Sequence, residues 1–273
     1  MKRLLFALLA VLAASSCAEK PYVIVQVADA QLGFTAADFS QKTGEEYVND
    51  LTYESECLTR AVEYINSMKP DAVVFTGDQV NRADDQEQWD AFAGIISGID
   101  SDIRVFHLPG NHDVRIENDS VDSTPFTSRY GADRFAFSEK GVNMAGINTN
   151  LIKAGDSKET AQVEWLYESL SSLPDENVTI VFGHHSFFMT DIEEEEGYFT
   201  ATKDERYFYF DIFESLGVDA FYAGHRHASY EGEYHGIKMI TTTSVAFQIG
   251  DGVPSVRVIT VKDGSVSDEL VAI

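Results

Sequence analysis

Hydrophobic and polar positions divide most of the chain into alternating strand-like and helix-like segments. Short runs rich in β-branched residues, such as Tyr22–Ala28 and Ala72–Thr76, predict buried strands. Apolar residues three and four positions apart predict helices, as between Leu58 and Met68. From Ile237 onward the pattern predicts strands alone. Strands and helices in alternation, followed by consecutive strands, are typical of an α/β layered sandwich.

The other predicted elements continue this alternation. Further strands are predicted at Ile103–Leu108, Val178–Phe182, Ala220–Ala223, Ile237–Thr242, Val256–Lys262 and Val266–Val271, and a hairpin at Arg134–Ser138 and Val142–Asn148. Further helices are predicted at Glu87–Ser97, Val163–Leu170 and Glu205–Leu216. Long loops are predicted at Leu32–Thr52, Val114–Arg129 and Thr190–Asp204.

The first 17 residues follow the pattern of a secretory signal peptide. Lys2 and Arg3 precede the apolar run Leu4–Ala14, which is too short to span a bilayer. Small residues then lead to Cys17, an arrangement that resembles the lipobox of bacterial lipoproteins, although Ala14 stands where that motif usually has leucine. We therefore expect a signal peptide over residues 1–16 and a single domain over residues 17–273.

This N-terminal layout also predicts where the protein resides. We expect a protein of the bacterial envelope, either periplasmic or anchored to the membrane through lipidated Cys17. The alternative is plain secretion in which Cys17 has no role. With Cys17 lipidated, Cys57 would be the one remaining thiol, so no intramolecular disulfide could form.

Composition changes this picture mainly through charge. The 273 residues, 44% of them hydrophobic, are enough for a substantial core and exclude intrinsic disorder. Lys and Arg number 20 against 45 Asp and Glu, so the formal net charge is −25. Loss of residues 1–16 would remove two cations and bring it to −27. A field of this sign disfavours nucleic acid as a partner, and an anionic substrate needs a local cation.

Polar motifs follow five of the predicted strands directly. They read Asp29-Ala30-Gln31, Gly77-Asp78-Gln79-Val80-Asn81, Gly110-Asn111-His112-Asp113, Gly183-His184-His185 and Gly224-His225-Arg226-His227. Each motif alone is weak evidence, because a turn or a helix cap explains it as well. Open α/β sheets, however, place ligand sites outside the carboxyl ends of their strands, so five such motifs can converge on one spot.

The side chains in these motifs are those that bind divalent cations. Carboxylate, amide and imidazole groups suit Mn²⁺, Fe, Zn²⁺ or Mg²⁺. Two metal ions about 3.5–4 Å apart need a bridging carboxylate, and Asp78 is the natural candidate. We expect a water held between the ions to be deprotonated near neutral pH and to act as the nucleophile. The two ions would also supply the local cation that an anionic substrate requires.

The order of the motifs, from Val23 to Val261, resembles that of the calcineurin-like metallophosphoesterases. Their pattern is Asp-x-His, Gly-Asp-x-x, Gly-Asn-His-Asp/Glu, Gly-His and Gly-His-x-His. The resemblance implies a layered sandwich of two mixed β-sheets flanked by helices. It also implies that Asp29 and His227 hold the first metal ion and that Asp78 bridges both. The ligands of the second ion would be Asn111, His184 and His225.

The same resemblance implies roles in catalysis and substrate binding. His112 resembles the family's catalytic histidine, which protonates the leaving oxygen or holds the phosphate together with Asn111, and Asp113 would orient it. His185 is expected either to contact the substrate or to be a plain loop histidine. For Arg226 we expect solvent exposure, and for His107 a core or surface role. The aromatic residues of 187–209 would line either a substrate cleft or the core edge.

Gln31 departs from the family pattern, which has histidine there. Its amide oxygen is a weaker donor than imidazole and favours a harder ion such as Mn²⁺ or Mg²⁺. A subgroup related to eukaryotic calcineurin-like phosphoesterase-domain proteins also has glutamine here, and Tyr130–Asn148 and Ala223–Val245 resemble that branch. Some of its members act on phosphoserine or phosphothreonine.

The sequence therefore predicts a metal-dependent phosphoesterase that hydrolyses a phosphomonoester of a small molecule or a phosphopeptide through a bimetal-activated water. A phosphodiesterase with the same centre is one alternative. A non-catalytic metal-binding surface lipoprotein is the other, and Gln31 is its only sequence support.

Overall fold

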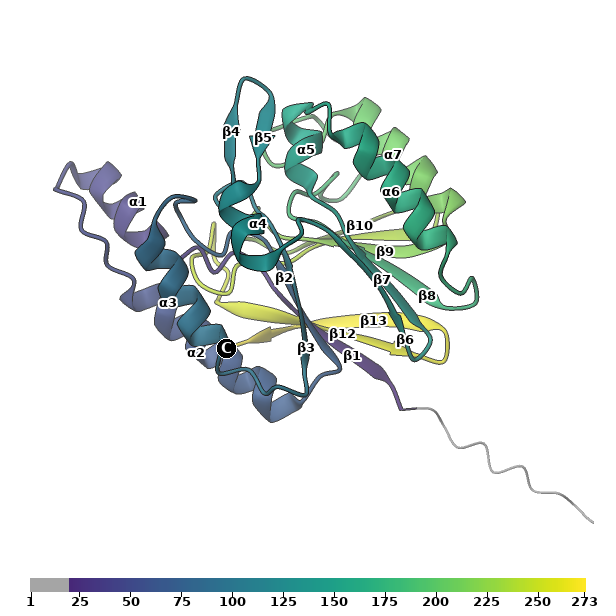
Figure 1. Cartoon of the computed structure of the whole chain (residues 1–273), viewed down its shortest axis with the longest axis horizontal. Coiled ribbons are helices and arrows are strands. Elements are labelled where there is room, and N and C mark those ends of the chain that lie inside the picture. The colour runs from purple at the N-terminus through teal and green to yellow at the C-terminus, as the bar shows by residue number, and fades with distance from the viewer. Residues whose placement is uncertain (1–19) are drawn as a thin grey trace, which may run out of the picture.

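Two β-sheets stack face to face, and helices cover both outer surfaces (Figure 1). The computed structural model describes residues 20–273, so the predicted signal peptide and Cys17 lie outside the described residues. This architecture confirms the predicted layered sandwich of two mixed sheets flanked by helices. Within the described part of the chain, no helix is both long and apolar enough to cross a membrane.

The first sheet has five strands in the order β13-β12-β1-β2-β3. Its strands are β1 (Tyr22–Val27), β2 (Ala72–Thr76), β3 (Arg104–Leu108), β12 (Ser255–Lys262) and β13 (Ser265–Ala272). Strands β1, β2 and β3 run parallel, whereas β12 pairs antiparallel with both β1 and β13. The parallel strands bring the chain that follows β1, β2 and β3 to one edge of the sheet.

The second sheet has six strands in the order β10-β11-β9-β8-β7-β6. Its strands are β6 (Phe135–Glu139), β7 (Val142–Gly146), β8 (Val178–Phe182), β9 (Val218–Ala223), β10 (Tyr230–Tyr234) and β11 (Ile237–Thr241). The four central strands are parallel, and β6 and β10 are antiparallel edge strands.

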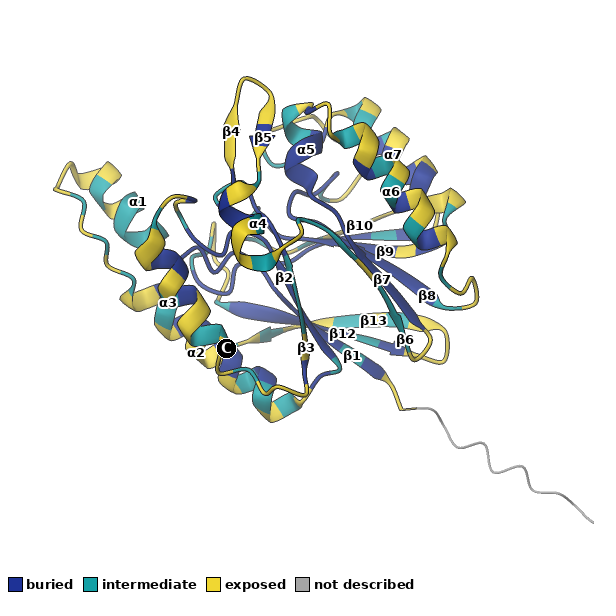
Figure 2. Cartoon of the chain, viewed as in Figure 1, coloured by how far each residue is buried: buried dark blue, intermediate teal, exposed yellow. Residues whose placement is uncertain are grey.

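Alternation along each strand builds the core in three layers, because successive side chains point to opposite faces of a sheet. In β2, Val74 packs between the sheets with residues such as Ile180, whereas Val73 and Phe75 face the outer helices. Helices α2 (Thr52–Met68) and α3 (Gln86–Ile96) cover the first sheet, and α6 (Glu159–Ser171) and α7 (Lys203–Ser215) cover the second. Figure 2 shows the buried inner faces of these helices.

Two of the three predicted loops contain regular structure. Helix α1 (Phe34–Thr43) lies within Leu32–Thr52. The ribbon of β4 (Arg115–Glu117) and β5 (Ser120–Asp122) lies within Val114–Arg129, and helix α4 (Thr124–Tyr130) extends one residue beyond it. Neither α1 nor β4 contains a buried residue, so the apolar periodicity that reveals an element is missing. The short helix α5 (Thr149–Ala154) and the edge strand β10 were likewise not predicted.

Candidate metal centre

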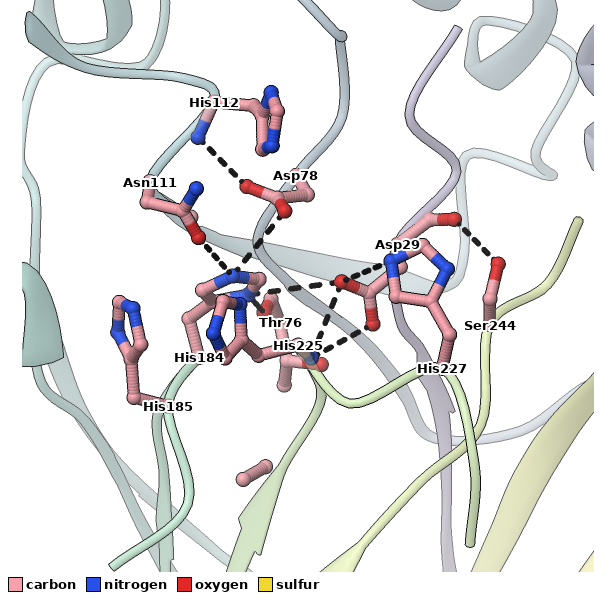
Figure 3. Close-up of polar contacts among 12 residues, drawn as sticks. Asp29, Thr76, Asp78, Asn111, His112, His184, His185, His225, His227 and Ser244 are labelled. Carbon is pink, nitrogen blue, oxygen red and sulfur yellow. Dashed lines mark hydrogen bonds and ion pairs between the residues drawn. The ribbon is translucent and has the colours of Figure 1, made fainter. Parts of the chain in front are cut away.

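The five predicted motifs meet at one place, between the carboxyl ends of strands from both sheets (Figure 3). Asp29 follows β1, Asp78 follows β2 and Asn111 follows β3, all from the first sheet. His184 follows β8 and His225 follows β9 from the second sheet. The side chains of these residues point toward one another (Figure 3). Because the two sheets stack, motifs more than 190 positions apart in the chain become neighbours.

The backbone at the centre is held in an unusual conformation. Eleven non-glycine residues among those described have a positive φ, and six of them lie in hairpin turns or at a helix end. The other five belong to the centre: Asp29, Gln31, Asp78, His225 and His227, with φ between 41° and 67°. Such residues cost about 1–3 kcal/mol each and persist where the surrounding structure holds them for a function.

Two glycines allow the backbone to approach the carboxylates. A Cβ on Gly110 would lie 2.0 Å from Asp78 Oδ1, and one on Gly224 would lie 2.6 Å from Asp29 Oδ2. No side chain fits at either distance. The glycines that precede Asn111 and His225 in their motifs are therefore required by close packing around the two carboxylates.

One group of ligand atoms surrounds Asp29. Atoms of Asp29, Asp78 and His227 lie within 4.8 Å of one another, and all three side chains are buried. Asp29 Oδ1 lies 3.5 Å from His227 Nε2, and the Asp29 carboxylate also accepts the backbone N–H of His225 at 2.9 Å. These are the residues expected at the first metal site. Gln31 is also buried, and its backbone N–H donates to the carbonyl of Asp78 at 2.7 Å.

A second group of ligand atoms surrounds His184. Its Nε2 lies 3.1 Å from Asn111 Oδ1 and 3.3 Å from Asp78 Oδ2. Side-chain nitrogens of His184, His185 and His225 lie within 4.8 Å of one another. Asp78 therefore reaches both groups, as expected for a carboxylate that bridges two ions.

Hydrogen bonds turn the imidazoles toward the centre. Nδ1 of His184 donates to the carbonyl of Thr76 at 2.9 Å, and Nδ1 of His227 donates to that of Phe247 at 2.7 Å. A carbonyl only accepts, so each Nδ1 carries a proton, and Nε2 is the nitrogen that would offer its lone pair to a bound metal ion. Gln31 Oε1 and His225 Nε2 are buried and have no hydrogen-bond partner among residues 20–273. Buried donor atoms left free in this way fit metal ions.

Charge interactions within the centre oppose the effect of burial. Burial lowers the pKa of His184, but the Asp78 and Asp29 carboxylates outweigh it and raise that pKa to about 9. Burial raises the pKa of Asp78, but His184 and His112 bring it well below its ordinary value. His225 responds to burial and to the charge of His184, which lower its pKa to about 3. In the absence of metal the centre thus holds an Asp78–His184 ion pair and a neutral His225.

His112 lies beside this centre, but Asp113 does not orient its ring as expected. The backbone N–H of His112 donates to Asp78 Oδ1 at 2.9 Å, and its Nδ1 donates to the carbonyl of Asn81 at 2.9 Å. The Asp113 carboxylate accepts three backbone N–H groups, those of Gln79, Val80 and Gly110. Asp113 therefore ties the loop after β3 to the loop after β2, and the Asn81 carbonyl orients the imidazole.

His185 differs from its neighbours in its protonated nitrogen. The hydroxyl oxygen of Thr149 accepts the backbone N–H groups of His184 and His185 at 3.1 and 2.8 Å. The Thr149 hydroxyl therefore uses its own proton to donate a hydrogen bond to His185 Nδ1, 3.1 Å away. Burial, followed by the charges of His225 and His184, holds the pKa of His185 well below its ordinary value. The neutral ring therefore carries its proton on Nε2, which makes this atom a donor rather than a metal ligand.

Aromatic rings border the centre, and of these Phe34 was not recognised in the sequence. The ring of Phe34 lies 5.8 Å from that of His227, and the rings of Tyr198 and Phe199 lie 5.3 and 5.5 Å from that of His225. Arg226 is not fully exposed as expected, because its guanidinium stacks 4.4 Å from the Phe199 ring. Of the aromatic residues in 187–209, Tyr198 and Phe199 border the centre, whereas Phe187, Phe188 and Tyr209 are core residues.

Arg206 holds the loop that carries Tyr198 and Phe199. This fully buried guanidinium donates to Thr200 Oγ1 and to four loop carbonyls, those of Ile192, Glu194, Glu195 and Ala201. In the sequence, Arg206 is only a cation within a predicted helix rich in aromatic residues. This pattern does not distinguish a buried arginine from an exposed one.

A fold of two stacked mixed sheets with two groups of metal-ligating side chains between their strand ends defines a metallophosphoesterase. The chain belongs to the calcineurin-like phosphoesterase family, whose sequence profile matches residues 8–229. This confirms the family resemblance and the prediction of a metallophosphoesterase. The family and the two groups of ligand atoms together support a centre for two metal ions.

Individual relatives agree with this assignment. The chain is 28% identical over 252 residues to the serine/threonine-protein phosphatase CPPED1 of Rattus norvegicus, covering 88% of this chain and 80% of that protein. A dimetal phosphatase from Danio rerio has a similar structure, with a TM-score of 0.61 and 14% identity over 93% of this chain and 99% of that one. GAP50, the anchor in the inner membrane complex of Plasmodium, has a TM-score of 0.63 and 13% identity over 93% and 85% of the two chains.

Proposed function

We propose that this protein hydrolyses phosphomonoesters at a centre of two divalent metal ions. The observation that carries the proposal is the pair of adjacent ligand groups joined by Asp78, whose Oδ2 lies 3.3 Å from His184 Nε2. The name of its rat relative, a serine/threonine-protein phosphatase, supports phosphoserine or phosphothreonine as the substrate group.

Residues of the two groups other than His185, together with Gln31 and Asn111, would divide between the ions as follows. Asp29, Gln31 and His227 would hold the first ion, Asn111, His184 and His225 would hold the second, and Asp78 would contact both. When bound, the two ions supply Lewis acidity and lower the pKa of a water that attacks phosphorus. The amide oxygen of Gln31 favours Mn²⁺ or Mg²⁺ at the first position.

Two histidines of the chain would act on the phosphoryl group directly. Nδ1 of His112 donates to the Asn81 carbonyl, so in the protonated, imidazolium form of this ring Nε2 would be the nitrogen that gives a proton to the leaving oxygen. Nε2 of His185 carries a proton because Thr149 donates to Nδ1, and it would donate a hydrogen bond to a phosphoryl oxygen. Asn111 would also contact the substrate, through the amide nitrogen that its metal-facing oxygen leaves free.

Hydrolysis of model esters tests the reaction. We expect the Mn²⁺-loaded protein to cleave p-nitrophenyl phosphate faster than bis(p-nitrophenyl) phosphate. The reverse order would identify a phosphodiesterase, and cleavage of neither, nor of any phosphopeptide, would refute the enzyme.

The variant Asp78→Asn tests the centre itself. An amide preserves the shape of the side chain but not the charge that two ions share, so we expect loss of activity with the fold retained. Asp90→Asn, on the outer helix α3, is the matched control and should behave as the wild type. Full activity of Asp78→Asn would show that the site is assigned wrongly.

A non-catalytic role has one observation in its favour. GAP50 is an anchor and shares the fold, so the fold alone does not decide catalysis. Metal analysis after Mn²⁺ loading separates the two functions. We expect about two equivalents per chain, whereas fewer than one would favour a binding protein.

We also propose that the protein resides in the bacterial envelope, anchored through lipidated Cys17. The support is the sequence of residues 1–17, with its basic start, short apolar run and small residues before the cysteine. Metabolic labelling with a palmitate analogue should mark the wild type and not Cys17→Ser. Absence of label on the wild type would remove the anchor from the proposal.

A further inference from the structure

A surface cavity of about 340 Å³ lies between helix α1 and the start of helix α2. Its apolar walls include Phe39, Val48 and Tyr53, which remain 54%, 70% and 43% exposed. Large apolar side chains left this open on so acidic a protein, and gathered around one cavity, are typical of a binding site. Helix α1, which forms one wall, has no buried residue of its own (Figure 2).

Carboxylates surround the same cavity. Glu45, Glu46, Asp50 and Glu54 line it, and no lysine or arginine of the described chain does. A concave surface lined by charges of one sign concentrates ions of the opposite sign. The charge of the cavity therefore selects a cation as its occupant.

Glu54 supplies an independent indication of a ligand. Only 1% of its surface is exposed, and its Oε1 accepts the backbone N–H of Thr35 at 2.7 Å, at the start of α1. Its other oxygen, Oε2, is buried and finds no hydrogen-bond partner anywhere in residues 20–273. A buried carboxylate oxygen without a donor is costly, so this atom is suited to receive an N–H group from a ligand.

The combination of walls and charge fits the side chain of arginine or lysine. The methylene stem of such a residue packs on apolar and aromatic surface while its head remains hydrogen-bonded. Phe39 and Tyr53 line the cavity with aromatic surface, which attracts cations, and Glu54 offers the free oxygen. A bare metal ion would gain nothing from these aromatic walls.

Two connections place the cavity beside the metal centre. Thr35 lines the cavity, and the preceding residue, Phe34, lies with its ring 5.8 Å from that of His227. Tyr53 lines the cavity, and its hydroxyl donates to the carbonyl of Ala246 at 3.4 Å. The next residue, Phe247, carries the carbonyl that orients His227.

We propose that this cavity binds an arginine or lysine side chain of a phosphopeptide whose phosphorylated residue occupies the metal centre. The proposal rests on the proposed phosphatase function and adds a substrate class to it, namely peptides with a basic residue near the phosphate. A protein of net charge −25 further favours a basic peptide over an acidic one.

Paired phosphopeptides test the proposal. Each pair carries a phosphoserine and, at one flanking position, either arginine or the uncharged norleucine. We expect a KM about 10-fold lower for one arginine peptide at similar kcat, which corresponds to about 1.4 kcal/mol. The difference should shrink as salt is raised, because the carboxylates of Glu45, Glu46 and Asp50 are exposed and salt screens their attraction for the peptide. Equal KM values for every pair would refute the proposal.

The variant Glu54→Gln isolates the charge. Its amide oxygen can still accept the Thr35 N–H, so the start of α1 stays in place while the charge is lost. We expect the arginine preference to disappear and hydrolysis of p-nitrophenyl phosphate to remain unchanged. Glu63→Gln, an exposed position on the same helix outside the cavity, should keep the preference. A preference that survives in Glu54→Gln would overturn the assignment.

Two further measurements separate this proposal from the enzyme it rests on. The double variant Glu45→Gln/Glu46→Gln changes the cavity rim without touching the α1 contact, and it should lower the arginine preference if Glu54→Gln fails to fold. Fluorescence anisotropy of unphosphorylated arginine and norleucine peptides reports binding without catalysis. If the arginine peptide binds and the norleucine peptide does not, the cavity proposal is supported even if no ester is cleaved. Equal binding of the two peptides contradicts the proposal.

Discussion

The close approach of Gly110 to Asp78 allows a sharp test of how the centre is built. In Gly110→Ala the new Cβ would lie 2.0 Å from Asp78 Oδ1 and 2.3 Å from the Asp78 backbone nitrogen. Contacts of this kind are already tight at 3.4 Å, so the oxygen would have to move by about 1.4 Å. The contact with backbone nitrogen means that a change of the Asp78 rotamer alone does not relieve the overlap.

The displacement would act on the atoms that define the centre. Asp78 Oδ1 accepts the His112 N–H at 2.9 Å, and Oδ2 lies 3.3 Å from His184 Nε2. Overpacking of this kind costs about 1–3 kcal/mol of folding stability. A catalytic group displaced by about 1 Å costs about 10²-fold in rate. We therefore expect both losses, together with a reduced metal content.

Urea unfolding, metal analysis and p-nitrophenyl phosphate hydrolysis measure the three effects. Gly94→Ala is the matched control, because this glycine lies in helix α3 and a Cβ there meets no other part of the described chain within 4 Å. Alanine is the better helix former, so the control should gain about 0.5–1 kcal/mol of stability. Wild-type activity and metal content in Gly110→Ala would refute the reasoning.

Three further changes probe the surroundings of the centre. His112→Ala should keep the metal ions but lower kcat by about 10²–10⁴-fold, as expected for loss of a general acid; unchanged kcat would exclude that role. Arg206→Met leaves four loop carbonyls without their donor and should cost about 2–4 kcal/mol in urea unfolding, so an unchanged midpoint would contradict its role as anchor. Burial lowers the pKa of His107 from 6.5 to about 3. Below pH 6.5 this histidine is therefore protonated in the unfolded chain but still neutral in the folded protein, so the wild type loses stability as pH falls. His107→Phe should remove about 2 kcal/mol of that loss between pH 6.5 and about pH 5, and parallel pH profiles of the two proteins would disprove it.

Much of the fold could be predicted because its signals are local. Strands β2 and β8 were predicted with the bounds that the structure has, since a short β-branched run bounded by polar residues identifies a buried strand without outside information. Helix α1 could not be predicted in this way. It lies on the surface, its caps are glycines without a side-chain bond, and Glu54 on another helix holds its first turn.

The candidate site divides in the same way. The types and order of its ligands were visible in the sequence, because donor chemistry belongs to individual side chains such as Asp78 and His184. The expectation that Asp113 orients the His112 ring was wrong, because two residues adjacent in the chain need not have side chains that face each other. The buried Asp113 carboxylate accepts three backbone N–H groups, and the carbonyl of Asn81 instead accepts the hydrogen bond from the His112 ring.

The sequence by itself determined the layered α/β class, the metal-binding chemistry and the five motifs that carry it, because each depends on residue type and short-range spacing. Tertiary structure alone decided which nitrogen of His184 and of His227 faces the centre, how Arg206 anchors the loop beside His225, and where Glu54 leaves an oxygen free. These features depend on hydrogen-bond partners brought together from distant segments. Local sequence patterns do not predict such partners, because these groups come together only when the two sheets and their helices pack.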